Sequence, residues 1–279
     1  MSNIPPLSIG VCSWSLQVTS IPELKGFVDQ LGINLVQIAC GDPHHAAWDE
    51  GDAMPQAALA AGFQLGGAML GFPGEDYTTP ATIQQTGGFG DPATRPERLE
   101  RLKWALQRTK DLNLTDLMLH AGFLPEVDDP SRKAFLDTLG TVSQLAAEHG
   151  ITIAFETGQE TAALLRRTLD DLQCNNLKVN FDPANMLLYD KDDPIKALEV
   201  LAGDIRTVHM KDANRPTKPG TWGTEVPLGE GQTNTRLFLE SLKKIGYQGP
   251  LFIEREVGNQ EERFRDIAHG VRFIQEVLA

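Results

Sequence analysis

Cysteine is scarce in this chain, and its three residues lie far apart. Cys12, Cys40 and Cys174 form no Cys-x-x-Cys pair. Disulfide-stabilised small domains and structural zinc sites both need several cysteines at close, regular spacing. The sequence therefore predicts neither a disulfide framework nor a zinc knuckle, and each cysteine is interpreted as a small apolar filler.

Basic residues are also in the minority. The chain has 25 Lys and Arg against 38 Asp and Glu, which gives a formal net charge of −13 at pH 7. The Lys and Arg residues are dispersed along the sequence and form no patch. Such a surface repels phosphate backbones and anionic lipid. We therefore expect no nucleic acid and no membrane among the partners of this protein.

Long apolar runs are missing as well. No segment approaches the roughly 20 apolar residues of a membrane helix, and residues 1–7 lack the charged and apolar regions of a signal peptide. We expect a soluble, cytoplasmic protein. With 279 residues and 41% hydrophobic content, the chain fits one α/β barrel better than two ordinary domains. No Pro- or Ser-rich linker divides it, so we predict a single domain over residues 1–279.

Short β-branched runs alternate with longer amphipathic runs along the whole chain. This alternation is typical of repeated βα units and a parallel sheet. The predicted strands are Ser8–Ser13, Leu35–Ala39, Gln64–Met69, Asp116–His120, Thr152–Glu156, Leu177–Asp182, Ile205–His209 and Pro250–Glu254. The predicted helices are Ile21–Leu31, Ala53–Ala61, Arg95–Leu112, Pro130–His149, Thr161–Leu172, Pro194–Leu201, Thr235–Ile245 and Glu261–Val277. About eight such units predict a (β/α)₈ TIM barrel.

Two of the connections are long. Gly71–Thr94 is rich in Gly, Pro and Thr and contains three aromatic residues, and Ala213–Asn234 contains Trp222. Long loops within a compact barrel more often have a functional role than serve as spacers. We expect both loops to cover the active site.

Four late strands end in an ionisable residue, which a buried strand should avoid. These residues are Glu156, Asp182, His209 and Glu254. Because side chains alternate along a strand, Asn180 and Asp182 are expected to face the barrel axis while their apolar neighbours face the helices. Ionisable groups that point inward cost several kcal/mol each unless they are paired or bind a metal.

The spacing of these four residues predicts one common site. Glu156 and Asp182 are 26 residues apart and Asp182 and His209 are 27 apart, each close to one βα repeat, whereas Glu254 follows His209 by 45 residues because of the inserted loop. The carboxyl ends of barrel strands converge on one site. Three carboxylates and one imidazole suit one divalent metal ion, either Mn²⁺, Mg²⁺, Co²⁺ or Zn²⁺.

Several motifs resemble the xylose-isomerase-like sugar phosphate isomerase/epimerase superfamily. They are Phe-Glu-Thr-Gly at 155–158, Asn-Phe-Asp-Pro-Ala-Asn at 180–185, Val-His-Met-Lys-Asp at 208–212, Pro-Leu-Gly-Glu-Gly at 227–231 and Phe-Ile-Glu-Arg-Glu at 252–256. The resemblance covers the fifth to the eighth strand, and the first half matches mainly in its βα rhythm.

The nearest described branch contains the tagatose and psicose 3-epimerases. The resemblance implies that Glu156, Asp182, His209 and Glu254 hold the metal and that the two glutamates also move the proton. It further implies a substrate-binding role for Arg215, which stands six residues after His209. The chain departs from this branch at Asn185, where those enzymes often have a histidine.

Six further residues are candidates for substrate binding, and each has a structural alternative. For His120, Asn185 and Lys211 the alternatives are, in turn, a hydrogen-bonded structural histidine, an orienting asparagine and a salt bridge to Glu230 or Asp212. For Arg215, Trp14 and Glu230 they are a solvated arginine, a packed tryptophan and a loop-shaping glutamate.

This constellation favours an isomerase or epimerase of a small sugar or sugar phosphate. The metal would stabilise an enediolate formed by removal of a proton alpha to a carbonyl, and Glu156 and Glu254 would take and return that proton. The substrate partner is a small carbohydrate, and we expect a homo-oligomer, either dimer or tetramer.

Three other functions are compatible with parts of the pattern. A metal-dependent lyase or dehydratase of the inosose or dehydroshikimate type begins with the same proton removal. A non-catalytic sugar-binding barrel would have little need for two carboxylates flanking the metal. An endonuclease IV-like nuclease needs additional histidine ligands, and the third-strand region, Leu65–Leu70, contains none.

Overall fold

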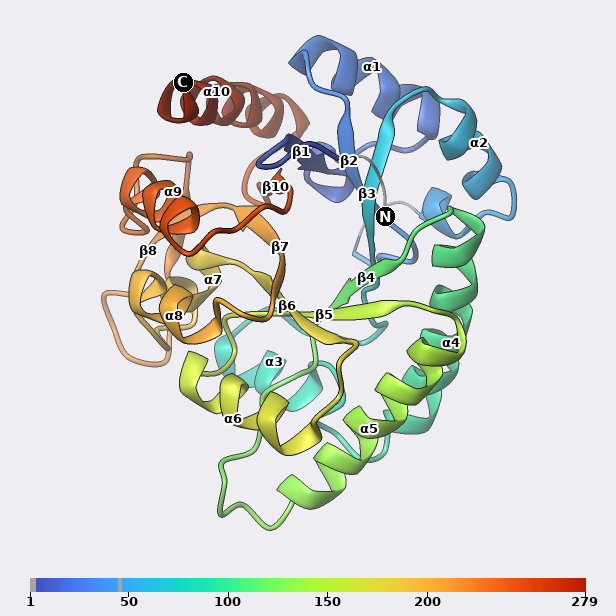
Figure 1. The fold of residues 1–279 in the computed structure, drawn as a ribbon, viewed down its shortest axis with the longest axis vertical. Helices are drawn as coiled ribbons and strands as arrows, with labels where there is room; N and C mark the ends of the chain where they lie inside the picture. Colours follow the sequence, from blue (N-terminus) through green and yellow to red (C-terminus); the bar gives the residue numbers. More distant parts are fainter. Residues whose placement is uncertain (1–3, 45–46) are drawn as a thin grey trace.

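Eight parallel strands form a closed barrel at the centre of the molecule (Figure 1). The computed structural model describes residues 4–44 and 47–279. Around the barrel the strands follow the order β1-β10-β7-β6-β5-β4-β3-β2, so the first and last strands of the barrel pair with each other. The barrel strands are β1 (Ile9–Cys12), β2 (Leu35–Ala39), β3 (Gln64–Met69), β4 (Asp116–Leu119), β5 (Thr152–Glu156), β6 (Leu177–Phe181), β7 (Ile205–Met210) and β10 (Leu251–Ile253).

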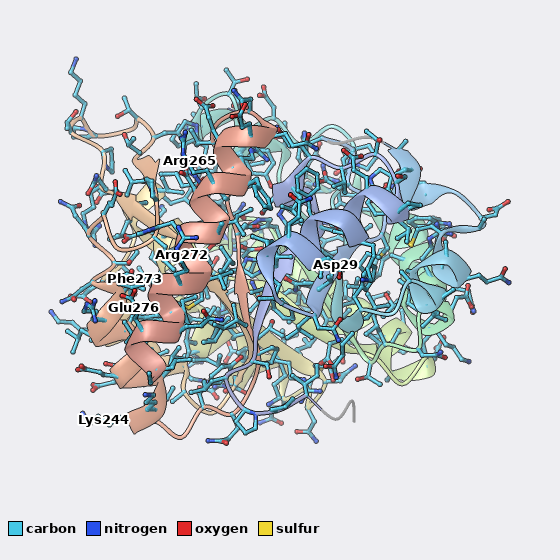
Figure 2. The ribbon with its side chains drawn as sticks, turned by 90° about the horizontal axis from the view of Figure 1, so that it is seen from above. Asp29, Lys244, Arg265, Arg272, Phe273 and Glu276 are labelled. Carbon is cyan, nitrogen blue, oxygen red and sulfur yellow. The ribbon has the colours of Figure 1, made fainter. Side chains whose placement is uncertain are left out.

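Helices surround this barrel on the outside, and Figure 2 shows α1 and α10 next to each other at its surface. The tilted rings of Phe27 and Phe264, 5.2 Å apart, join these two helices. The outer helices are α1 (Ile21–Leu31), α2 (Met54–Ala60), α4 (Arg95–Asp111), α5 (Arg132–Glu148), α6 (Ala162–Leu172), α8 (Pro194–Leu201), α9 (Thr235–Lys244) and α10 (Gln260–Leu278). The predicted (β/α)₈ TIM barrel is thus confirmed, with element ends that shift by one or two residues.

The sequence prediction missed the short elements. Besides the 3₁₀ turns Ser13–Leu16 and Ala47–Glu50, they are α3 (Pro80–Thr86), α7 (Pro183–Leu188) and the hairpin β8 (Asp212–Asn214) and β9 (Thr224–Val226). Elements of three to seven residues complete too few periods for a hydrophobic pattern to reveal them. α3 and β9 lie within the two long connections and β8 overlaps the start of the second, so both connections contain folded segments.

Helix boundaries follow local hydrogen bonding. Ser20 begins α1 by accepting a bond from the Glu23 amide, and Gly32 ends it in the left-handed conformation at φ 66°. Asn259 and Glu262 begin α10 with a reciprocal capping box. These side chains satisfy amide groups that have no partner within the helix.

None of the helices formed by residues 4–44 and 47–279 is long and apolar enough to span a bilayer.

The interior of the barrel has its own hydrophobic cluster, separate from the larger core between strands and helices. Ala154 and Phe252 belong to this inner cluster, and each precedes a candidate metal ligand, Glu156 or Glu254, by two residues. Phe252 fills the axis because Gly10 and Gly66 leave room for its ring. The other members of the inner cluster are Cys12, Trp14, Leu35, Ala39, Met69 and Met118.

Gly10→Ala tests this packing. A Cβ at position 10 would lie 2.7 Å from Cδ1 of Phe252 and 2.9 Å from the backbone oxygen of Leu35. We expect the free energy of unfolding to fall by about 1–3 kcal/mol, because an overpacked core must shift. Urea denaturation measures the change.

Gly140→Ala is the matched control. Gly140 lies in α5, and nothing would stand within 4 Å of its Cβ. Alanine is favoured over glycine in a helix by up to about 1 kcal/mol. We therefore expect a small gain in stability, and a Gly10→Ala variant as stable as the wild type would contradict the packing described here.

Candidate metal and active site

Four ionisable side chains converge at the carboxyl ends of four adjacent barrel strands. One potential ligand atom from each of Glu156, Asp182, His209 and Glu254 lies within 4.8 Å of the others. His209 Nδ1 lies 3.1 Å from Glu156 Oε1, 3.4 Å from Glu254 Oε2 and 3.8 Å from Asp182 Oδ2. All four residues are buried. The barrel thus brings together the four side chains that the sequence pattern predicted to share a site.

Asp182 follows β6 directly and begins helix α7. Its Oδ1 accepts hydrogen bonds from the amides of Ala184 (2.7 Å) and Asn185 (2.9 Å). Its Oδ2 is buried and has no hydrogen-bond partner among the described residues. A buried carboxylate oxygen without a partner is costly, so this atom is suited to bind a cation within the cluster.

Gln37 orients the imidazole of His209. Its Oε1 lies 2.7 Å from His209 Nε2, so Nε2 carries the proton that is donated to this carbonyl oxygen. When this ring is neutral, as a histidine that binds a metal must be, it presents the lone pair of Nδ1 toward the three carboxylates. Such hydrogen bonds, made by the ring nitrogen that does not bind the metal, fix the orientation of metal-binding histidines in proteins.

Lys211 supplies positive charge beside the cluster. Its Nζ donates to Glu254 Oε2 at 2.9 Å and also to Glu256. Burial tends to lower the pKa of Lys211, but the carboxylates of Glu254 and Glu256 raise this pKa well above its ordinary value. Lys211 is therefore held charged by the site.

The two central carboxylates respond differently to this environment. Burial favours a higher pKa for Glu254, but the charges of Lys211 and His209 hold its pKa well below the ordinary value. Burial raises the pKa of Asp182 to about 6. The charge of Lys211 opposes this rise, whereas the charges of Glu254 and Glu156 add to it.

The donor set fits a divalent cation. With Lys211, the carboxylates of Glu156, Asp182 and Glu254 leave a formal charge of −2, since one ammonium offsets one of three carboxylates. Carboxylate oxygens and one imidazole nitrogen are ligands for Mn²⁺, Mg²⁺, Co²⁺ and Zn²⁺. Together with the unpartnered oxygen of Asp182, this excess of negative charge makes the cluster a candidate metal site.

A cavity of about 610 Å³ opens above the cluster, and Glu156 and Glu254 form part of its wall. This volume is within the usual range for small-molecule sites, roughly 300–1,000 Å³. Both long connections contribute to it: Tyr77 comes from the first, and Trp222 from the second. The indole of Trp222 donates to the backbone oxygen of Tyr77 at 3.1 Å, so the two loops meet over the mouth.

Three of the predicted substrate-binding residues line this cavity. Trp14 donates from Nε1 to Glu254 Oε1 at 2.7 Å. His120 lies with Nε2 3.7 Å from Glu156 Oε2. Asn185 donates from Nδ2 to Glu156 Oε1 at 3.0 Å. Trp14 and Asn185 thus fix one oxygen on each of the two glutamates.

The other three predicted substrate-binding residues lie elsewhere. Arg215 and Glu230 do not line the cavity. The guanidinium of Arg215 binds Asp190 Oδ1 at 2.7 Å and the backbone oxygen of Asp192, which holds it on the outer side of the loop. Glu230 is exposed in a turn. Lys211 does not line the cavity either. It pairs with Glu254 and Glu256, so the predicted partners, Glu230 and Asp212, were wrong.

Four residues of the site were missed by the sequence prediction. Gln37 is a polar residue in an otherwise apolar strand, Leu-Val-Gln-Ile-Ala. Glu256 continues the alternation that begins with Phe252 and Glu254. Both residues could therefore have been recognised from the sequence. Glu225 and Tyr77 lie in the long loops and follow no such pattern. Glu225 accepts from Nη1 of Arg255 at 2.7 Å and from the Glu256 amide at 3.0 Å.

The closed barrel with this cluster at its mouth defines a TIM barrel of the xylose isomerase-like type. A family model described as "Xylose isomerase-like TIM barrel" matches residues 25–277. The chain belongs to this family.

Individual relatives agree with this assignment. A xylose isomerase domain protein from Planctomyces limnophilus is 32% identical, with a TM-score of 0.86 and coverage of 98% of this chain and 97% of that one. L-ribulose-5-phosphate 3-epimerase UlaE of Escherichia coli K12 is 28% identical over 199 residues, which is 69% of this chain and 68% of the relative. A D-allulose 3-epimerase from Methylomonas sp. is 17% identical, with a TM-score of 0.70 over 99% of both chains, and shares the fold.

Gln37→Leu tests the orientation of His209. The variant keeps the approximate side-chain volume and removes the acceptor for Nε2–H, so the imidazole can rotate or change tautomer. We expect the affinity for Mn²⁺ to fall by about 10–100-fold, as for other residues that hydrogen-bond to metal ligands. Titration of the metal-free chain with Mn²⁺ in a calorimeter measures this.

Gln64→Leu serves as the control, because Gln64 begins β3 and does not line the cavity. Equal Mn²⁺ affinity in the Gln37 and Gln64 variants would show that Gln37 does not position the histidine.

Proposed function

We propose that this protein is a divalent-metal-dependent isomerase or epimerase of a small carbohydrate. It would act by proton transfer alpha to a carbonyl through an enediolate. Membership of the family supports an enzyme of this class, and the name of the UlaE relative states that it is a 3-epimerase of a ketose phosphate. A small carbohydrate is therefore the expected substrate.

The position of the two glutamates carries this proposal. Glu156 and Glu254 come from β5 and from the end of β10, and the strands between them, β6 and β7, lead to Asp182 and bear His209. Both glutamates line the cavity, whereas Asp182 and His209 do not. Two carboxylates at the two ends of this arc can reach a substrate from two sides, as removal and return of a proton on opposite faces requires.

Glu156, Asp182, His209 and Glu254 would hold the metal. A bound Mn²⁺, Mg²⁺, Co²⁺ or Zn²⁺ would polarise the substrate carbonyl and increase the acidity of the neighbouring C–H bond. Glu156 and Glu254 would then exchange the proton with the substrate carbon. Return to the same carbon from the opposite face gives an epimer, and return to the neighbouring carbon gives an isomer.

The remaining residues would position these groups. Asn185 holds Oε1 of Glu156, and Trp14 and Lys211 hold the two oxygens of Glu254. His120 lines the cavity beside Glu156 and is placed to bind a substrate hydroxyl. The loops that meet at Tyr77 and Trp222 would exclude water during proton transfer.

We also propose that residues 1–279 act as one catalytic domain. Pairing of β1 with β10 joins the first and last strands of the barrel, and both contribute to the site through Trp14 and Glu254. A homo-oligomeric state, dimer or tetramer, stays a prediction.

Glu156→Gln and Glu254→Gln test the proton transfer. Glutamine keeps the shape and one oxygen but cannot accept the proton, so each variant should lose turnover by about 10²–10⁴-fold while its unfolding temperature is retained. The measurement is NMR in D₂O with Mn²⁺, over ketoses, aldoses, their phosphates and inososes. Deuterium should appear at the carbon next to the carbonyl, together with an epimer or isomer.

Glu240→Gln is the control, since this glutamate is exposed on α9 and should leave turnover unchanged. Normal turnover in both active-site variants would exclude the assigned roles. Loss of water from the substrate would instead place the protein with the lyases and dehydratases, and no deuterium exchange with any sugar would favour a sugar-binding barrel.

A further inference from the structure

We propose that the substrate is an uncharged sugar and that the cavity rejects its phosphate ester. This inference rests on the proposed function and specifies its substrate class. It differs from the substrate in the name of the UlaE relative, which is a phosphorylated ketose. Two features of the structure carry it: the charge of the cavity wall, and the occupation of the backbone amides that would bind a phosphate.

The cavity wall is strongly acidic. Six carboxylate residues line it, whereas Arg263 is the one Lys or Arg among the lining residues of the described chain. Two of the six belong to the candidate metal cluster, and four lie around it. The acidic lining residues are Asp42, Glu75, Glu156, Glu225, Glu254 and Glu256.

A bound cation does not reverse this charge. The six carboxylates and Asp182 carry seven formal negative charges, Arg263 and Lys211 offset two, and a divalent cation offsets two more. Arg255 pairs with Glu225 and also with Asp266, which does not line the cavity. The charges of Arg255 and Asp266 cancel, so neither is counted. A formal charge of −3 remains, which repels a phosphate ester with its own charge of about −2.

The amides that could form a phosphate site are occupied by Asp212. In TIM barrels, phosphate is commonly bound by backbone amides of the loops after the seventh and eighth strands. Here β7 is the seventh strand of the barrel, and Asp212 follows it. Its Oδ2 accepts from the amides of Gly229 (2.9 Å) and Gly231 (3.0 Å), and its Oδ1 accepts from the Thr233 amide (3.1 Å).

Hydroxyl groups complete this internal anion site. Thr233 Oγ1 donates to Asp212 Oδ1 at 2.8 Å, and Thr235 Oγ1 donates to Oδ2 at 3.2 Å. A Cβ at Gly231 would lie 2.3 Å from Asp212 Oδ1, which shows how closely the loop encloses the carboxylate. The amides of this loop are therefore occupied by a carboxylate of the chain itself and are not free to bind a phosphate.

Backbone amides in the loop after β10 are also used within the protein. The amide of Glu256 donates to Glu225 Oε1 at 3.0 Å. At the start of α10, the Asn259 amide donates to Glu262 Oε2 (2.9 Å) and the Glu262 amide donates to Asn259 Oδ1 (3.0 Å). These side chains thus use two of the amides that would otherwise attract an anion to this helix end.

Arg263 is also committed within the protein. Its Nε donates to the backbone oxygen of Gly258 at 3.0 Å, and its Nη2 donates to that of Glu256. Its Nη1 is buried and has no hydrogen-bond partner among the described residues, so this nitrogen is not accessible to an anion in the cavity. Among the residues that the structure describes, no exposed cation is thus available in the cavity wall.

The same wall suits a neutral polyol. Carboxylates are strong acceptors for sugar hydroxyl groups, and the aromatic rings of Trp14, Tyr77, Tyr189 and Trp222 offer apolar faces to sugar C–H groups. An uncharged ketose gains both interactions without bringing a negative charge into an acidic cavity.

Paired ligands test this inference in the Mn²⁺-loaded protein. A ketopentose and its 5-phosphate, and a ketohexose and its 6-phosphate, are compared by calorimetric binding and by deuterium exchange. Of the two free ketoses, the one that binds more tightly should have a Kd about 100-fold below that of its own phosphate ester at low salt. This ratio of the two Kd values should shrink as ionic strength rises, because screening weakens the repulsion.

Glu75→Gln probes the charge directly. Glu75 lines the cavity away from the candidate metal ligands, and glutamine keeps the oxygen that accepts the Gly88 amide at 2.7 Å. This variant should narrow the ratio between ester and free ketose by about 3–10-fold. Glu276→Gln, on the outer helix α10 (Figure 2), removes the same charge outside the cavity and should leave the ratio unchanged.

Binding and turnover distinguish the two proposals. Preferential binding of the free ketose without deuterium exchange would support charge selection and refute the proposed reaction. Exchange with the ester at equal or greater kcat/KM, or equal or tighter binding of the ester, would refute charge selection and retain the reaction. If none of the four ligands binds, the proposed substrate class is refuted.

Discussion

Repulsion between buried carboxylates is the constraint on which this site depends. Glu156, Asp182 and Glu254 converge beneath one cavity and would destabilise the barrel without compensation. Lys211 compensates one charge, and a divalent cation would compensate the rest. The unfavourable free energy of burying these carboxylates therefore favours cation binding, because a positive ion between the ligands would remove their repulsion.

The fold supplies the precision that such a site needs. Strands fix the heights of Glu156 and His209, and the first turn of α7 restrains one oxygen of Asp182. Gln37 on β2 and Trp14 in the turn after β1 restrain His209 and Glu254. Glu156, His209 and Glu254 are thus each held by a residue of another element and Asp182 by the helix that it begins, so the geometry of the cluster is set before substrate arrives.

The strand-borne part of the site could be predicted from the sequence, and the loop-borne part could not. A strand has a period of two, so the ends of four strands sufficed to place Glu156, Asp182, His209 and Glu254 together. The path of a long loop depends on contacts that have no period. Arg215 was therefore assigned to the substrate although it binds Asp190, and Glu225 was overlooked although it lines the cavity. The role of Asp212 likewise required the positions of three amides distant in sequence.

The contact between Trp14 and Glu254 joins residues 240 positions apart in the chain. Before β10 leaves the ribosome during synthesis, the barrel has a gap between β1 and β7, and the candidate ligand Glu254 is missing. No partly translated chain can therefore assemble the complete cluster. Under the proposed function, activity would arise only when the last strand inserts, so a truncated product would be inert.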